Sequence, residues 1–182
     1  MFGMLGSSRW LRAIVISIAA LAGVIAEGSP ARSLSLAALS LAELDAAADV
    51  VVRGHCIDRT PTHSSGRIES VARFRVVEKL RGEAGEVVEV RQWGGEIGDR
   101  ATVAPGAPLS QPGDDAVLFL AAEPDGTYRV VGVSSGYLPV VISPLGRPVV
   151  RVSRTLGAEF AGAVAWPIER FADRLQRLPR AR

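Results

Sequence analysis

Residues 68–80, IESVARFRVVEKL, decide the fold that the sequence predicts. Along this run Ala72 and Phe74 alternate with Arg73 and Arg75, so one face is apolar and the other is charged. Alternation with a period of two is typical of a β-strand with one buried face. Because the run is longer than most strands, we expect it to curve around a barrel and to serve two sheets.

Further strands are predicted on both sides of this run. Each is a short apolar or alternating stretch bounded by glycine, proline or aspartate residues. They cover residues 50–57, 87–92, 116–121, 128–133, 138–142 and 148–152. Five to seven short strands without alternating helices predict an all-β fold with minor helix content, in the form of a small antiparallel OB-like β-barrel.

Two helices are expected to flank the strands. Ser40 and Glu43 have the spacing of a capping box, which predicts a short N-terminal helix. Pro167 suits the first turn of a second helix near the C-terminus. This second helix is predicted to be amphipathic and to cap the barrel. Its apolar stripe comprises Ile168, Phe171, Leu175 and Leu178.

The first 26 residues have the pattern of a secretory signal peptide. Arg9 and Arg12 precede the uncharged run 13–26, and no acidic residue lies within or before it. A basic segment followed by a short apolar run is typical of such signals, and a bilayer-spanning helix needs roughly 17–25 apolar residues. We expect cleavage after Ala26, or else after Ala31, and a periplasmic or extracellular location. An uncleaved signal that anchors the chain is the alternative, and it is the only membrane attachment expected.

The rest of the sequence predicts one domain. A flexible lead-in at 27–39 is followed by the OB-like β-barrel at 40–152 and by a linker and C-terminal helix at 153–182. This length suffices for a single core. Cys56 is the only cysteine, so no intrachain disulfide can form. Its place in an apolar strand predicts a buried, unreactive thiol.

The charge balance argues against a nucleic-acid partner. Without the two basic residues of the signal, the chain carries 19 basic and 19 acidic side chains. Phosphate binding needs a surplus of Lys and Arg on one face. Residues 147–182 do hold 8 basic against 3 acidic residues, which predicts either a solvated helix face or a contact with an acidic partner or membrane surface.

The candidate binding region is the long excursion at 93–113, which glycine and proline residues interrupt repeatedly. A loop of this length is typical of a functional or partly disordered segment. Trp93 stands beside Gly94 and Gly95, followed by Glu96, and an aromatic next to a flexible glycine pair can clamp a partner. The alternative is that Trp93 fills the end of the barrel. The adjoining charged face comprises Arg73, Arg75 and Arg91.

Two residue groups offer an alternative, catalytic reading. Residues 132–136 match the G-x-S-x-G pattern of serine hydrolases, with Ser134 as the nucleophile. However, a strand is predicted after this motif, and both histidines precede it. His55 and His63 could hold a metal, although His55 and its neighbour Cys56 point to opposite faces of a strand. No dinucleotide or phosphate-loop motif is present, and no cofactor is expected.

The strand pattern of residues 48–133 resembles the netrin-like domain, which is the OB-type barrel of the tissue inhibitors of metalloproteinases. The similar segments are ADVVVRG at 48–54, the long strand ending in EKLRG at 78–82, VVEVR at 87–91, and more weakly 113–120 and 125–130. The resemblance implies a barrel and, by analogy, a protein partner such as an exported protease. Those inhibitors act through an N-terminal cysteine that chelates the protease zinc, and several disulfides hold their fold. Here the single cysteine lies within a predicted strand, so no inhibitory residue carries over.

Together these observations predict an exported, non-catalytic binding or interaction module. Its expected partner is an exported protease or an envelope protein. A small exported hydrolase that uses Ser134, or a metal at His55 and His63, is the second hypothesis. A structural component of an envelope assembly is the third. The sequence leaves the oligomeric state open.

Overall fold

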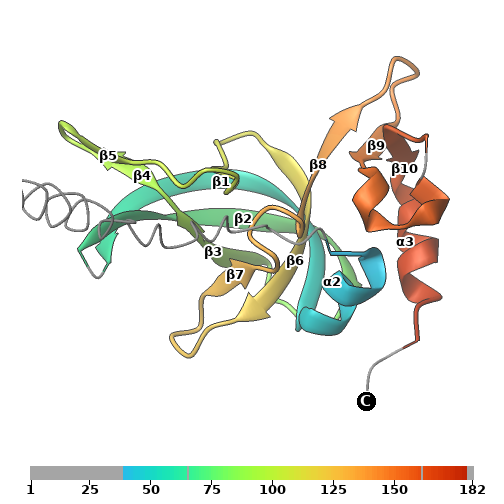
Figure 1. Ribbon diagram of the computed structural model, residues 1–182, viewed down its shortest axis with the longest axis horizontal. Coiled ribbons are helices and arrows are strands. Elements are labelled where there is room, and N and C mark those ends of the chain that lie inside the picture. The colour runs from blue at the N-terminus through green and yellow to red at the C-terminus, as the bar shows by residue number, and fades with distance from the viewer. Residues whose placement is uncertain (1–38, 65, 161, 180–182) are drawn as a thin grey trace, which may run out of the picture. The chain divides into compact units, whose positions relative to one another are not determined.

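The computed structural model describes residues 39–64, 66–160 and 162–179 (Figure 1). The signal peptide predicted at 1–26 lies outside the described residues, as does the lead-in at 27–39 except for its last residue. In chain order the elements are α2 (Leu41–Ala47), β1 (Val50–Ser64), β2 (Arg67–Arg81), β3 (Val87–Trp93), β4 (Gly95–Ile97), β5 (Arg100–Thr102), β6 (Asp115–Ala122), β7 (Tyr128–Val130), β8 (Tyr137–Ile142), β9 (Pro148–Arg151), the 3-10 turns η1 (Arg154–Leu156) and η2 (Ala158–Phe160), β10 (Ala165–Pro167) and α3 (Ile168–Gln176).

The predicted fold class is confirmed. Strands hold 49% of the residues and helices 15%, and five strands close into a barrel. The barrel order is β1-β2-β3-β7-β6, and β6 pairs back with β1. This is the Greek-key order of an OB-type barrel. The barrel is not purely antiparallel, because β3 and β7 pair in parallel. This pair results from the tight β6–β7 hairpin, which brings β7 back alongside β3 in the same direction.

The long strand that predicts the fold is β2. It pairs with β1 along its whole length and with β3 over residues 69–75. Three register shifts in β1 allow this strand pair to bend. β1 is longer than expected, because it continues beyond the strand predicted at 50–57 as far as Ser64. Pro61 is tolerated there, since β6 pairs with β1 only up to His55 and one edge of β1 has no strand beyond that point in the described sheet.

Two apolar cores lie on opposite sides of the barrel wall that β1 and β6 form. The first core fills the barrel and comprises Val50, Val52, Cys56, Ala72, Phe74, Val88, Val90, Ala116, Leu118 and Leu120. The second core joins the outer side of the same wall to α2, to the β8–β10 strands and to α3. Its larger members include Leu41, Leu44, Val117, Phe119, Val150, Phe160, Trp166, Phe171 and Leu175. The segment after residue 152 therefore shares the second core with the outer side of the β1–β6 wall.

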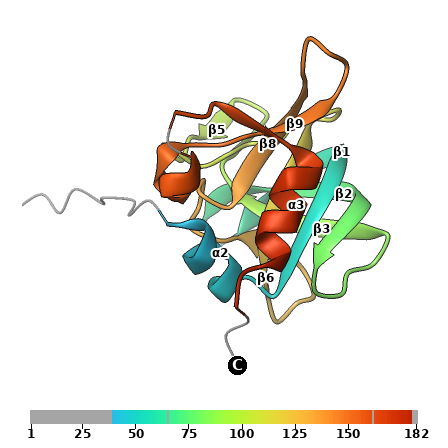
Figure 2. The ribbon, with the colours of Figure 1, turned by 90° about the vertical axis from the view of Figure 1, so that its right-hand side faces the viewer.

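Both predicted helices are present. The capping box of α2 is formed, with the Ser40 amide donating to Glu43 Oε2 at 2.8 Å and the Glu43 amide donating to Ser40 Oγ at 3.3 Å. The apolar stripe of α3 is buried, but the helix does not cap the barrel end as predicted. It packs on the outside of the wall (Figure 2). There the Phe171 and Phe119 rings meet edge to face, with their centres 6.5 Å apart. Among the described residues, no helix has the length and apolar character needed to cross a membrane.

Candidate binding site on the outer face of β2, β3 and β7

The opposite wall of the barrel, formed by β2, β3 and β7, carries polar side chains on its outside. In β3 the buried residues Val88, Val90 and Gln92 alternate with the more exposed Glu89 and Arg91. The alternation follows from the strand period of two, which directs successive side chains to opposite faces. We call the outside of this wall the charged face. Of its side chains, those of Arg73 and Glu89 are about half exposed.

Trp93 stands at the end of β3 on the charged face and is 40% exposed. The guanidinium carbon of Arg129, from β7, lies 4.5 Å from the centre of the indole ring. This distance is within the range of a cation–π interaction. Trp93 therefore does not fill the end of the barrel, which was the alternative to a binding role. The polar pair Gln92 and Ser110 is buried beside it instead.

Glu69 connects the two arginines of the charged face. It lies opposite Trp93 in the β2–β3 register, yet it is only 4% exposed. Its carboxylate lies 3.4 Å from Arg129 Nη2 and 3.7 Å from Arg91 Nη1. A buried carboxylate needs such partners, because an unpaired charge in a protein interior is strongly destabilising. Glu69 thus holds both guanidinium groups, and that of Arg129 lies over Trp93.

Two acidic residues complete the ion-pair network from the β6–β7 hairpin. Glu123 lies 3.3 Å from Arg129 Nε, and Asp125 pairs with Arg91 Nη2. The hydroxyl and amide of Thr127 donate to Asp125 Oδ1 at 2.6 Å and 3.1 Å. These hydrogen bonds lower the pKa of the Asp125 carboxyl, so they favour its charged form beside Arg91. We call Trp93, Arg91, Arg129, Glu69, Glu123 and Asp125 the Trp93 cluster.

A small hollow opens beside the Trp93 cluster. Its volume of about 20 Å³ is enough for one water molecule. Its lining includes Arg91, Trp93 and Arg129 together with Pro108 and Val133. Val133 has a φ of 60° and is the only non-glycine residue with positive φ among those described. For a β-branched residue this conformation is strained, and such strain concentrates at functional sites.

The predicted glycine pair has a packing role. A Cβ atom at Gly95 would lie 2.6 Å from Ser70 Oγ, and one at Gly94 would lie 2.8 Å from the Thr102 carbonyl oxygen. Ser70 Oγ also donates to the Gly94 carbonyl oxygen at 2.8 Å. Gly95 therefore lets the chain pass closely over β2, and Gly94 lets it pass closely beside Thr102 of β5. A side chain at either position would overlap its neighbours.

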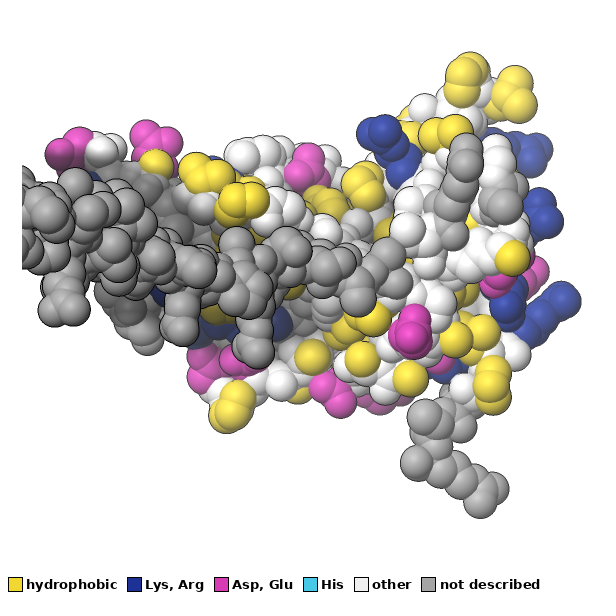
Figure 3. Space-filling model, in the orientation of Figure 1, with side chains coloured by type: hydrophobic (Ala, Val, Ile, Leu, Met, Phe, Trp, Pro, Cys, Tyr) yellow, Lys and Arg dark blue, Asp and Glu magenta, His cyan; other side chains and the backbone are white. Residues whose placement is uncertain are grey.

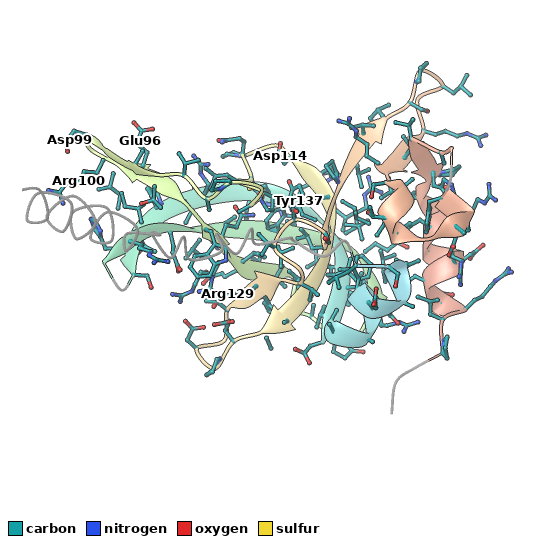
Figure 4. The ribbon with its side chains drawn as sticks, in the orientation of Figure 1. Glu96, Asp99, Arg100, Asp114, Arg129 and Tyr137 are labelled. Carbon is teal, nitrogen blue, oxygen red and sulfur yellow. The ribbon has the colours of Figure 1, made fainter. Side chains whose placement is uncertain are left out.

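The excursion at 93–113 is partly a hairpin, which the sequence analysis missed. Residues 95–97 and 100–102 form the antiparallel strands β4 and β5. Glu96 lies on this hairpin close to its tip, with Asp99 and Arg100, well separated from Arg129 (Figure 4). Glu96 was predicted to be part of the binding surface beside Trp93. The structure does not bring it to the Trp93 cluster.

The predicted arginines Arg73 and Arg75 do lie on the charged face. They follow Glu69 on the same side of β2, with Arg73 opposite Glu89 and Arg75 opposite Val87. Arg73 Nε lies 3.7 Å from Glu89 Oε1, and both side chains are about half exposed. They therefore extend the charged face away from Trp93, whereas Arg91 belongs to the Trp93 cluster itself.

The geometry around Ser134 differs from that of a hydrolase nucleophile. Ser134 is exposed in a turn that leads into strand β8. The hydrolase motif requires a helix after the serine, because the strand–turn–helix bend is what raises the nucleophile above the sheet. Ser134 borders a shallow depression of about 450 Å³ lined by Ser135, Arg151 and Thr155, among others.

His55 and His63 cannot hold one metal ion together. Both lie on β1, eight positions apart, and a strand rises by about 3.3 Å per residue, so roughly 25 Å separates them. Metal–nitrogen bonds measure only about 2.0–2.1 Å. Among residues 39–64, 66–160 and 162–179, no three His, Cys, Asp or Glu side chains are grouped as metal ligands would be.

A second depression lies beside β8, away from the Trp93 cluster. Its volume is about 490 Å³, and its lining includes His55, Asp114, Asp115 and Tyr137. Tyr137 donates its hydroxyl to Asp114 Oδ2 at 3.4 Å (Figure 4). Burial raises the pKa of Tyr137 to about 12. Asp115 lies 2.7 Å from Arg53 Nη2 and 3.8 Å from His55 Nδ1. The acidic groups of this depression are therefore already engaged with neighbouring side chains.

Comparison with known proteins adds no assignment to this geometry. No protein-family model matches the chain, and no curated protein is similar to it at a significant level.

Proposed function

We propose that this protein is an exported, non-catalytic binding module whose contact surface is the charged face centred on Trp93. The observation that carries the proposal is the half-exposed indole of Trp93, held under Arg129 beside Arg91. Tryptophan and arginine are the residue types most enriched at the energetic centres of protein interfaces. The corresponding face of strands 2 and 3 is also a contact surface in other OB-type barrels, where it binds oligonucleotides and oligosaccharides.

The Trp93 cluster is arranged before any partner arrives. Glu69 and Glu123 hold Arg129, and Arg129 holds the indole of Trp93. Binding through a side chain that is already fixed loses less conformational entropy than binding through a mobile one. A small contact area around Trp93 can therefore contribute a large share of the binding free energy.

The charges of the Trp93 cluster favour a protein partner. Its two arginines face three carboxylates, from Glu69, Glu123 and Asp125. A phosphate-rich ligand needs a clear excess of positive charge, which this balance does not supply. An apolar or aromatic side chain of a partner could stack on Trp93, while its polar rim meets Arg73 and Arg75. The pattern of the first 26 residues favours an exported partner, either a protease or an envelope protein. The protease possibility rests on the resemblance to the metalloproteinase inhibitors.

Site-specific photocrosslinking tests the proposal. A benzoylphenylalanine in place of Trp93 is expected to crosslink to a discrete protein in the cells that produce the chain. The matched control is the same residue at position 83, in the β2–β3 turn, where the native side chain is 96% exposed. Crosslinks of equal yield and pattern at both positions, or none at position 93, would contradict the proposal.

Purification of the protein from the same cells distinguishes the competing functions. A structural component would appear in a stoichiometric complex that survives purification without crosslinking, whereas a binding module would release its partner. A hydrolase would react with a fluorophosphonate probe and lose the label in Ser134→Ala. Labelling that depends on Ser134 would overturn the non-catalytic assignment.

A further inference from the structure

The hairpin between β8 and β9 projects from the described body, and its end carries exposed apolar side chains. We call residues 141–147 the β8–β9 tip. Leu145 is 86% exposed, Ile142 66% and Val141 40%. The first two are among the most exposed large hydrophobic residues of the described chain. Figure 3 shows hydrophobic side chains at this projecting end, with dark-blue arginines next to them.

The β8–β9 tip is held in one shape. The Ser143 amide donates to the Arg147 carbonyl at 2.8 Å, and the Gly146 amide donates to the Ser143 carbonyl at 2.9 Å. The Arg147 amide donates to Ser143 Oγ at 3.2 Å. Ile142 and Leu145 are thus presented to solvent by an ordered turn, so their exposure is part of the fold.

Basic residues surround the apolar end without local acidic partners. Arg147, directly before β9, and Arg151, its last residue, are exposed, and no ion pair of the described residues involves either one. The sequence has no acidic residue between Asp125 and Glu159. This arrangement differs from that of the charged face, where each arginine of the Trp93 cluster already has carboxylate partners.

We propose that the β8–β9 tip is a membrane contact, which inserts Ile142 and Leu145 into an anionic lipid surface. An apolar end with a basic collar is complementary to acyl chains beneath negatively charged headgroups. A narrow, convex tip fits a fluid lipid surface, whereas a stable protein interface needs about 800 Å² from each partner. This contact is independent of the Trp93 cluster.

A fluorophore placed on the tip tests this proposal in the full chain. Residues 13–26 are apolar and can themselves bring the chain to a vesicle, so the readout must be local. We would attach the environment-sensitive dye NBD to Leu145→Cys in a Cys56→Ser background. Vesicles of phosphatidylglycerol and phosphatidylcholine in equal parts are expected to blue-shift and brighten the emission. The matched control is Val103→Cys, which is 82% exposed on the excursion after β5 and should not respond.

Charge reversal provides the second arm. Arg147→Glu combined with Arg151→Glu should raise the vesicle concentration needed for half of the Leu145→Cys signal by about tenfold or more. Unchanged circular dichroism would show that the fold is retained. An equal response with pure phosphatidylcholine, or an equal response at position 103, would overturn the proposal. So would a change in emission with protein concentration alone, which indicates a second copy of the chain, or a specific protein crosslink at position 145.

Discussion

The two tryptophans of the described body show how differently its two sides are used. Each has an arginine stacked on it, with guanidinium-to-ring distances of 4.5 Å for Trp93 and Arg129 and 4.2 Å for Trp166 and Arg170. Trp166 is only 7% exposed and packs against Phe160 in the second core, whereas Trp93 is 40% exposed on the charged face. Of these two arginine–tryptophan pairs, one therefore places its tryptophan, Trp166, in the second core, whereas the other leaves Trp93 exposed on the charged face.

The difference follows from what covers each wall of the barrel. The outer side of β1 and β6 carries apolar side chains and lies beneath α2, α3 and the β8–β10 strands. The outer side of β2 and β3 carries charged side chains instead. Apolar burial is the main source of folding free energy, so the covered wall should dominate stability. The charged face should tolerate change and affect binding.

The largest effect is expected from the covered wall. Phe119 is fully buried and touches Phe171 across the second core. Phe119→Ala should lower the free energy of unfolding by about 4 kcal/mol, because it removes apolar contacts and leaves a cavity. Urea denaturation measures this change. Val103→Ala, at an exposed site, should change it by less than about 0.5 kcal/mol. A similar loss in both variants would remove the distinction between the covered and exposed regions.

Among the residues of the charged face, Glu69 should contribute the most to the free energy of unfolding, because it is buried. Glu69→Gln should cost about 2 kcal/mol, because Arg91 and Arg129 lose their shared buried carboxylate. Glu89→Gln is the matched control on β3, where the ion pair with Arg73 is half exposed and worth less than about 1 kcal/mol. Thermal unfolding of both variants at equal ionic strength decides the point. Equal losses would show that burial of Glu69 does not matter.

The glycines after Trp93 allow a test of the close packing between residues 94–95 and their neighbours. Gly95→Ala should cost about 2 kcal/mol, since its Cβ atom would overlap Ser70 Oγ and its φ of 154° is unfavourable for alanine. Gly98→Ala shares only the backbone cost, about 1 kcal/mol, because open space surrounds its Cβ position. Urea denaturation of both variants compares the two. Should Gly95→Ala be no worse than Gly98→Ala, the packing role of Gly95 would be wrong.

The outward residues of the charged face could be predicted from β-alternation alone. The period of two placed Arg73, Arg75 and Arg91 outside and Phe74 inside, as observed. Arg129 was missed because it reaches Trp93 through the parallel β3–β7 pair, and nothing in the local pattern specifies that pair. Glu69 was missed because alternation predicts an exposed carboxylate, whereas its ion pairs with Arg91 and Arg129 explain its burial.

The excursion at 93–113 shows that the local sequence pattern can also predict a loop where the structure has a strand. Glycine and proline residues at 93–113 predicted a loop, yet residues 95–97 form strand β4. Glycine is needed at position 95 because the chain passes close to Ser70 there. Similarly, the stripe of α3 predicted burial correctly but not the surface that it packs on. A periodic stripe identifies an apolar face. Which neighbouring face it meets depends on the tertiary fold.

The depression beside β8 offers a comparison that depends on pH. Tyr137 is desolvated, which raises its pKa to about 12, whereas an unfolded tyrosine titrates near about 10. Its contribution to stability should therefore be complete below about pH 10 and should be lost as the pH rises from there toward about 12. In Tyr128→Phe, Tyr137 is the only tyrosine, and tyrosinate absorbance can follow it. A folded-state midpoint equal to that in urea would contradict this.

The smallest effect on stability is expected at Trp93, and it gives the sharpest form of the comparison. Trp93→Ala removes a half-exposed ring and one cation–π contact, so the free energy of unfolding should fall by no more than about 1 kcal/mol. Trp166→Ala is the matched variant, and it should cost about 3–5 kcal/mol because its ring is buried. Binding of a crosslinked partner, once isolated, should weaken by at least about 2 kcal/mol in Trp93→Ala and remain unchanged in folded Trp166→Phe. A large loss of stability in Trp93→Ala without any loss of binding would instead assign Trp93 to the fold and remove the basis of the proposed contact surface.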